Sequence, residues 1–206
     1  MQDTSHLNVR VDRRFSLAEL MAGIEFDVQY RISKSSMDRS AFEDRSVRLR
    51  IDLSKSAYPL AKVGNADSIT LRVRGGGSSQ IFERTDFFGR PSQVSSTGDL
   101  MVRVIIDSMG IRISDSDLIQ RVDISLYDAI FSNEILLQNP LGKKYKITEI
   151  SANNLSDIKV KVQNQGLVTQ TGARGAYIFE IKVNRPDLST LTESESALVK
   201  ELLKKI

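Results

Sequence analysis

The chain has 206 residues, 40% of them hydrophobic and 27% charged, which is the balance of an ordinary globular protein without a membrane span or an export signal. It contains no cysteine, which excludes disulfides and thiolate zinc sites and favours a reducing, cytoplasmic location. The net charge is +3, but Lys and Arg are interleaved with Asp and Glu, which argues against a nucleic-acid partner.

The first predicted elements are a strand, a short helix and a second strand. Apolar residues alternate over residues 7–11 and again over residues 26–32, as they do in half-buried strands. Between them Ser16 and Glu19 have the spacing of a capping box, and Gly23 ends the helix. The pattern therefore predicts a strand, helical turn and strand unit.

Three further stretches before Thr97 are predicted to be loops. Residues 33–46 are polar and poor in apolar side chains, so a loop is expected there before alternation resumes over residues 47–53. Residues 75–79 are glycine-rich like a linker. The equivalent residues 163–166 lie inside a second copy of this part of the sequence, so we place this segment within the first domain. The residues from there to Thr97 are also expected to be loop-like.

A sequence motif from the first part of the chain is then repeated. Residues 9–26 have a second copy at residues 121–135, and each copy is followed by an alternating strand and a closing strand. These later strands lie at 69–73 and 100–104 in the first copy and at 158–162 and 177–181 in the second. Because order and direction agree, the sequence predicts two tandem β-domains of one ancestry.

The predicted fold is mostly β, with two tandem β-sandwich-like domains, short helical turns and a C-terminal helix. The first domain spans residues 7–107, the second spans residues 108–189, and the helix lies within residues 190–206. The boundary is placed near Asp107, where the first repeat ends.

The last predicted element is a helix from about Thr192 to Lys205. Thr192 and Glu195 have capping-box spacing, and the apolar residues of the helix share one arc. That stripe consists of Leu198, Val199, Leu202, Leu203 and Ile206. It either packs back on the second domain or forms a contact between two chains of a homodimer.

No catalytic or metal site assembles from the sequence. The only histidine, His6, lies near the N-terminus and is expected to be solvated. Asp115 and Asp117 lack the glycine turn and glutamate of a calcium loop, so a hairpin loop is expected there. Residues 172–175 are too short for a phosphate cradle and precede a strand, so they are expected to form a turn. The sequence predicts neither an enzyme nor a cofactor.

Four motifs occur one after another along the chain: Val9 to Gly23, Gly98 to Val104, Asp117 to Ala129 and Pro186 to Ser189. In this order they resemble the substrate-binding C-terminal region of DnaJ-type co-chaperones over about residues 7–203. The resemblance implies two twisted β-sandwich domains of the zinc-free subtype. The chain lacks the His-Pro-Asp motif of a J-domain, so it is expected to be either cut from a longer protein or naturally without that domain.

The resemblance also implies a function, which is to bind unfolded or extended polypeptide and pass it to a DnaK-type chaperone. The implied groove lies between the first two strands of the first domain, lined by Val11, Val28, Tyr30 and Val102. Arg13 stands where family members usually have an apolar residue, and a cation there favours acidic clients. The alternative for the three valines is an ordinary place in the core, whereas the hydroxyl of Tyr30 tolerates a wet rim.

Two other functions stay open at this point. A scaffold or interaction protein would keep the sandwich pair and the helix without general client binding, as Arg13 suggests. A carbohydrate-active enzyme has little support, because tryptophan is absent and no paired carboxylates stand out. Suppression of the aggregation of a denatured protein separates the chaperone from the scaffold.

Overall fold

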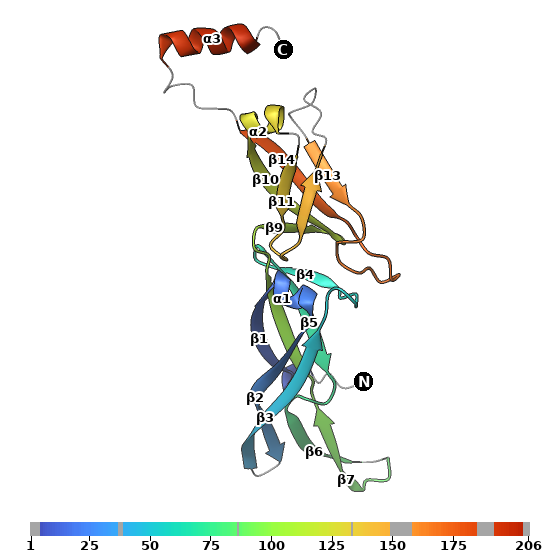
Figure 1. Ribbon diagram of the computed structural model, residues 1–206. Coiled ribbons are helices and arrows are strands. Elements are labelled where there is room, and N and C mark those ends of the chain that lie inside the picture. Colours follow the sequence, from blue (N-terminus) through green and yellow to red (C-terminus); the bar gives the residue numbers. More distant parts are fainter. Residues whose placement is uncertain are drawn as a thin grey trace. The chain divides into compact units, whose positions relative to one another are not determined.

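The computed structural model describes residues 5–36, 39–85, 87–132, 134–148, 158–184 and 192–203 (Figure 1). The described residues fall into two units. The first unit is formed by those in Met1–Ile119 and Val162–Tyr177, and the second by those in Gln120–Lys161 and Ile178–Ile206. The boundary near Asp107 separates the two repeats of the sequence, and as a domain boundary it stays a prediction.

The first sheet has the strand order β1-β8-β5-β4. Its strands are β1 (Val9–Ser16), β8 (Leu100–Asp107), β5 (Ala66–Val73) and β4 (Leu60–Val63). β1 runs parallel to β8, whereas β5 is antiparallel to both β8 and β4. Alternate side chains of β8 are buried, as a period-2 strand requires, and these are Leu100, Val102, Val104 and Ile106.

The second sheet has the strand order β3-β2-β6-β7. Its strands are β2 (Ile24–Ser36), β3 (Arg39–Ile51), β6 (Ser79–Thr85) and β7 (Pro91–Thr97). β2 and β3 form a long antiparallel hairpin, and β6 joins β2 in parallel at Lys34 and Ser35. Side chains along β2 alternate between an exposed face and an inward face, and Val28 and Ile32 are buried on the inward face.

The prediction of loops over residues 33–46 and 80–97 is wrong, because these stretches belong to the β2–β3 and β6–β7 hairpins, whereas residues 75–78 do lie in the turn before β6. Much of the β2–β3 hairpin is stabilised by cross-strand charges instead of burial. Asp27 pairs with Arg48 at 3.0 Å and Arg31 with Asp44 at 2.7 Å, each directly across the ladder. Opposite charges at facing positions stabilise a strand pair without leaving an apolar pattern in the sequence.

The predicted helical turn between the first two strands is confirmed as α1 (Leu17–Ala22). The backbone N–H of Ser16 donates to Glu19 Oε2 at 2.8 Å, and the N–H of Glu19 donates to Ser16 Oγ at 3.2 Å, which completes the capping box. Leu17 and Leu20 are fully buried, so α1 anchors the connection between β1 and β2 in the core.

The second repeat contains β9 (Ile111–Ser114), β10 (Asp117–Ser125), α2 (Leu126–Phe131), β11 (Ile135–Gln138), β12 (Lys144–Ile147), β13 (Ile158–Val162) and β14 (Tyr177–Asn184). One sheet has the order β13-β14-β10-β9, and β11 pairs with β12. The neighbouring strands β10, β14 and β13 have the same order in their sheet as β1, β8 and β5 have in the first sheet. In addition, α2 follows β10 as α1 follows β1. Its N-cap Ser125 accepts from the N–H of Asp128 at 3.0 Å. This supports the predicted duplication.

Each repeat also contains the same pair of crossing glycines, which we call the glycine lock. In the first repeat Gly77 N–H donates to Gly98 O at 2.9 Å, and Ser78 N–H donates to Leu7 O at 2.8 Å. In the second, Gly166 N–H donates to Gly175 O and Leu167 N–H donates to Ser116 O, both at 2.8 Å. The lock therefore holds the segment entering β1, or β10, against two other segments of the chain.

Only glycine fits the centre of this lock. A Cβ on Gly98 would lie 2.3 Å from the carbonyl carbon of Leu7, and one on Gly175 would lie 2.1 Å from Ser116 O. Both distances are far shorter than any van der Waals contact between such atoms. The two glycines are thus required by close backbone approach.

Asp99, next to Gly98, ties the lock to the turn after β5. Its carboxylate accepts from the N–H of Gly75 at 2.8 Å and pairs with Arg72. The hydrogen bond from Gly75, followed by that from Arg72, lowers the pKa of Asp99 below its usual value. The carboxylate therefore remains charged through the neutral range.

The predicted C-terminal helix is confirmed as α3 (Glu193–Leu203), and residues 204–206 lie outside the described part. The N–H of Thr192 donates to Glu195 Oε2 at 2.9 Å, as the capping box predicts. The predicted hairpin turn after β9 is also confirmed, with Asp115 at a φ of 53°. Among the described residues, no helix is long and apolar enough to cross a membrane.

Candidate functional site

Two strands of the first unit offer free edges close to one another. β1 is the last strand of its sheet and is paired only with β8 among the described strands. β2 pairs with β3 on one side, whereas on the other side β6 joins it only from Lys34 onward. β1 and β2 contact each other, so both edges belong to one region of the surface (Figure 1).

The spacing of these two strands is fixed at the α1 end. The rings of Phe15, in β1, and Phe26, in β2, lie with centroids 4.7 Å apart at an angle of 54°. Aromatic pairs at this distance and tilt stabilise a packed contact beyond the area that they bury. The alternation of the sequence placed Phe26 on the face of Val28 and Tyr30, but it gave no sign of the partner across from it.

The sequence-predicted lining residues lie at two depths. Val28 and Val102 are 0% exposed, so they lie in the core beneath the surface. Val11, Arg13 and Tyr30 are half-buried and present part of their side chains to solvent. In the parallel ladder Val11 stands beside Val102, which brings these two predicted residues together. The role of all five in client binding stays a prediction.

Tyr30 lines a surface concavity of about 690 Å³ on the β2–β3 hairpin. Its other lining residues are Gln29, Arg31, Asp44, Arg45 and Ser46. Arg45 stands directly across the ladder from Tyr30, and its Nε lies 3.1 Å from Glu43 Oε1. No sequence pattern marks Arg45, because residues 33–46 are polar and poor in apolar side chains.

Fixed charges of both signs surround Tyr30. The hydrogen bond from Arg31 lowers the pKa of Asp44, and the hydrogen bond to Glu43 raises the pKa of Arg45. These groups keep their charges at neutral pH, so the concavity offers a phenol ring with cationic and anionic neighbours. Such a surface can bind polar and aromatic groups.

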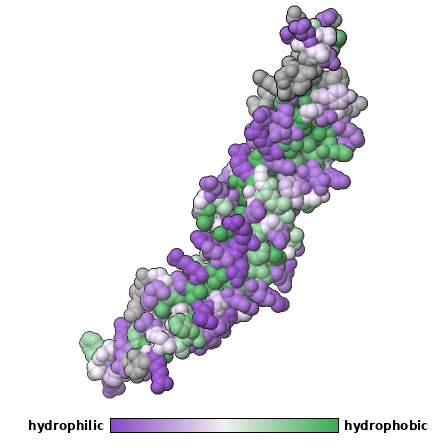
Figure 2. Space-filling view, turned by 90° about the vertical axis from the view of Figure 1, so that its left-hand side faces the viewer, coloured by the Kyte–Doolittle hydropathy of each residue, from purple (hydrophilic) through white to green (hydrophobic). Residues whose placement is uncertain are grey.

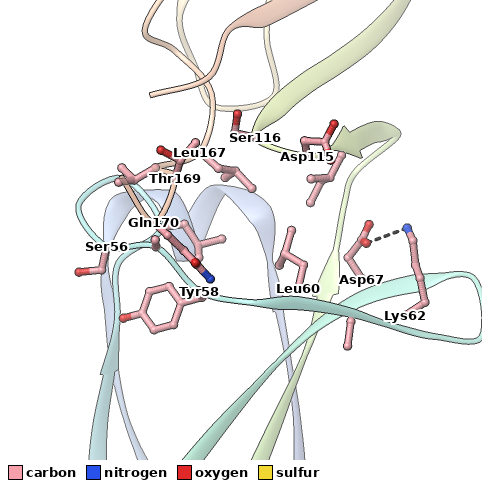
Figure 3. A pocket seen from close by; sticks show the side chains of 15 residues that line it. Ser56, Tyr58, Leu60, Lys62, Asp67, Asp115, Ser116, Leu167, Thr169 and Gln170 are labelled. Atoms are coloured by element: carbon pink, nitrogen blue, oxygen red, sulfur yellow. Dashed lines mark ion pairs between the residues drawn. The ribbon is translucent and has the colours of Figure 1, made fainter. Parts of the chain in front are cut away.

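A second cavity of about 550 Å³ lies elsewhere in the first unit (Figure 3). Figure 3 shows Leu60 and Leu167 entering it from two segments, with the ion pair between Lys62 and Asp67 at its edge. No motif in the sequence indicates this cavity. Among the described residues, no group of His, Asp and Glu side chains is arranged to hold a metal ion there or elsewhere.

A family model described as the DnaJ C terminal domain matches residues 9–186. The chain belongs to the DnaJ C-terminal domain family. The match includes both repeats, from the start of β1 to beyond β14, and it confirms the resemblance drawn from the sequence motifs. No curated protein matches the sequence.

Membership in the DnaJ C-terminal domain family gives the two free edges a context. The family is one of chaperone domains and not of enzymes, and it indicates a chaperone-related role in binding client polypeptide. The β-sandwich-like repeats fit this family. On the face shown in Figure 2, hydrophobic residues lie among hydrophilic ones.

Proposed function

We propose that this DnaJ C-terminal domain protein binds unfolded or extended polypeptide along the free edges of β1 and β2 and delivers it to a DnaK-type chaperone. The observation that carries the proposal is the closeness of two unpaired strand edges in a chain of this family. Holding a client needs no catalytic step and no cofactor, and the ATP-driven work belongs to the partner chaperone.

Strand addition explains how one surface accepts many sequences. An extended client hydrogen-bonds through its backbone to a free edge, and every polypeptide has the same backbone groups. Val11 and Tyr30 then contact the client's apolar side chains, while Val28 and Val102 support the surface from below. Affinity thus comes from the backbone and a modest selectivity from the half-buried side chains.

Arg13 adds a charge preference to this surface. It lies on the same face of β1 as Val11 and Phe15, half-buried, with Nη1 donating to Asp12 O at 3.0 Å. A partly desolvated cation attracts carboxylates more strongly than one in bulk water. Clients with acidic residues beside apolar ones are therefore favoured over basic clients.

Replacing Tyr30 with Ala is expected to weaken binding of an unfolded protein about tenfold, because aromatic residues on a binding surface carry a large share of the affinity. Stability should change by only about 1 kcal/mol, since the ring is half-buried. Fluorescence anisotropy with a labelled unfolded protein and thermal unfolding measure the two effects. Tyr127→Ala, at an exposed tyrosine of α2, is the matched control. Large destabilisation with unchanged binding would assign Tyr30 to the core.

We also propose that α3 joins two chains into a homodimer, which would let one client be held at two sites with higher avidity. Leu198 is 61% exposed and Val199 is half-buried, so part of the predicted stripe has no cover in one chain. Leu202 and Leu203 belong to α3, but their side chains, like Ile206, lie outside the described part. The contribution of these three to a dimer stays a prediction.

Leu198→Asp is expected to weaken the dimer about a hundredfold, because a twofold contact loses the apolar side chain from both chains. Sedimentation over a range of concentrations measures the shift from dimer to folded monomer. Ala197→Asp places the same charge on the polar side of α3 and should leave the dimer intact. If the unchanged protein sediments as a monomer at tens of micromolar, roughly the usual assay range, the stripe packs within its own chain.

A further inference from the structure

The two edges of the second sheet differ in their protection. β3, at one edge, carries charged side chains along its whole length, including Arg45, Arg48 and Arg50. β7, at the other edge, has the sequence Pro-Ser-Gln-Val-Ser-Ser-Thr and is the one strand of this sheet without a charge. Charged side chains on an edge strand disfavour the addition of an uncharged strand, so of these two edges β7 is the more open to one.

The side chains of β7 are mostly exposed and small. Five of its seven residues are exposed, and only Val94 and Ser96 are half-buried. Val94 stands across the ladder from Phe82 of β6, which is also half-buried. Within the described chain β7 pairs with β6 alone, and its outward backbone groups face solvent. Pro91 removes one donor, but only at the first residue of the strand.

The turn between β6 and β7 presents two aromatic rings. Phe87 is 98% exposed and Phe88 is 82% exposed, and the rings meet edge to face with centroids 5.8 Å apart. The adjacent rings of Phe87 and Phe88 mark an interaction surface, because burying each one in a partner is favourable.

We infer that the open edge of β7 and the ring pair of Phe87 and Phe88 form a second binding site for extended, uncharged polypeptide segments of the client. Three observations indicate that this site binds an extended, uncharged segment. An unpaired edge recognises an extended backbone, an edge without charges accepts segments without charges, and the exposed rings contact a large apolar side chain at one end. β7 also belongs to the sheet that offers the β2 edge, so both sites act on one client.

This inference rests on the proposed function and extends it. A client bound at the β2 edge has its next segments held near the same sheet, and a second weak site then raises the overall affinity through effective concentration. The β7 site differs in selectivity, because β2 carries charged side chains whereas β7 itself carries none.

The test uses the full chain and a labelled, permanently unfolded protein, reduced and carboxymethylated α-lactalbumin. Adding this probe should slow amide hydrogen exchange over residues 91–97. Gln93→Lys with Ser95→Lys places two charges on exposed positions of the edge and should weaken probe binding about fivefold or more. Asn65→Lys with Gln163→Lys adds the same charge at exposed turn positions outside this sheet and should leave binding unchanged.

A second double variant controls for the possibility that the added lysines disrupt the β6–β7 hairpin. Phe87→Ser with Phe88→Ser leaves the β7 sequence intact and should also weaken binding, with an unchanged melting temperature. If neither variant weakens binding and residues 91–97 exchange at the same rate with the probe, the β7 site is overturned. The proposed function survives that result as long as Tyr30→Ala still weakens binding.

Three other results overturn the inference in distinguishable ways. If the unchanged protein binds no probe, both the β7 site and the proposed function are overturned. Protection of residues 91–97 that grows with protein concentration in the absence of probe would assign the edge to a second copy of this chain. Protection by vesicles of phosphatidylserine and phosphatidylcholine, but not by the unfolded protein, would assign the rings to a lipid surface.

Discussion

Alanine at Gly98 is expected to lower the free energy of unfolding by about 3 kcal/mol or more, which would unfold a large fraction of a marginally stable protein. The added Cβ would lie 2.3 Å from the carbonyl carbon of Leu7 and 2.7 Å from the N of Asn8. Both are backbone atoms, so no side chain can rotate away to make room. The segment before β1 must move, and the hydrogen bonds of the glycine lock are then strained or lost. Urea unfolding followed by circular dichroism measures the loss.

Gly64→Ala is the matched control for this change. Gly64 has a φ of +60° and no atom within 4 Å of an added Cβ, so alanine there pays only the left-handed backbone cost of about 1–2 kcal/mol. Gly175→Ala should behave like Gly98→Ala, because the second lock has the same crossing. Equal losses for Gly98→Ala and Gly64→Ala would show that the lock yields easily to a methyl group.

Val102→Asp is expected to destabilise the protein by about 3–5 kcal/mol, the usual cost of a buried charge without a partner. Val102 is 0% exposed in the middle of β8, between Val11 of β1 and Leu71 of β5 in the ladder. A carboxylate there loses its water and meets apolar neighbours on both sides. Thermal and urea unfolding should both report the loss.

Thr70→Asp provides the comparison on an exposed neighbouring position. Thr70 lies across the ladder from Arg103, so the new carboxylate gains a cation and remains in water, and the stability change should stay within about 0.5 kcal/mol. If Val102→Asp kept its stability but lost client binding, Val102 would be a contact residue and not part of the core.

The sequence predicted those parts of the fold that depend on local pattern. Alternation identified the strands with one buried face, such as residues 100–104, and capping boxes located α1 and α3 at Ser16 and Thr192. The order of repeated motifs predicted both the duplication and the family. These signals are carried by residues close to one another along the chain, so a reader of the sequence can detect them.

The missed elements depend on partners far away or on polar pairing. The hairpin over residues 33–46 contains serines and charged residues whose stability as strands comes from facing charges, and such pairs are visible only when the register is known. The glycine lock was missed because Gly77 and Gly98 meet the backbone of Leu7, which lies at the other end of the repeat.

The residues of the candidate site were also predicted only in part. Period 2 put Val28, Tyr30 and Val102 on inward-facing positions, but it gave no measure of depth, and the structure buries the two valines while leaving Tyr30 at the surface. Arg45 could have been found only from the register of β2 and β3. The open edge of β7 had one signal in the sequence, a run of seven residues without a charge, which composition alone reads as a loop.

The parallel pairing of β1 with β8 has a consequence for the life of the newly made chain. Asp12 of β1 and its ladder partner Arg103 lie 91 positions apart, so on the ribosome β1 is complete long before its partner β8 exists. At usual rates of synthesis this wait lasts roughly 5–20 s. The β2–β3 hairpin closes over far fewer residues and needs no such wait. Until β8 emerges, β1 is an unpaired, partly apolar strand of the kind that the finished protein is proposed to hold.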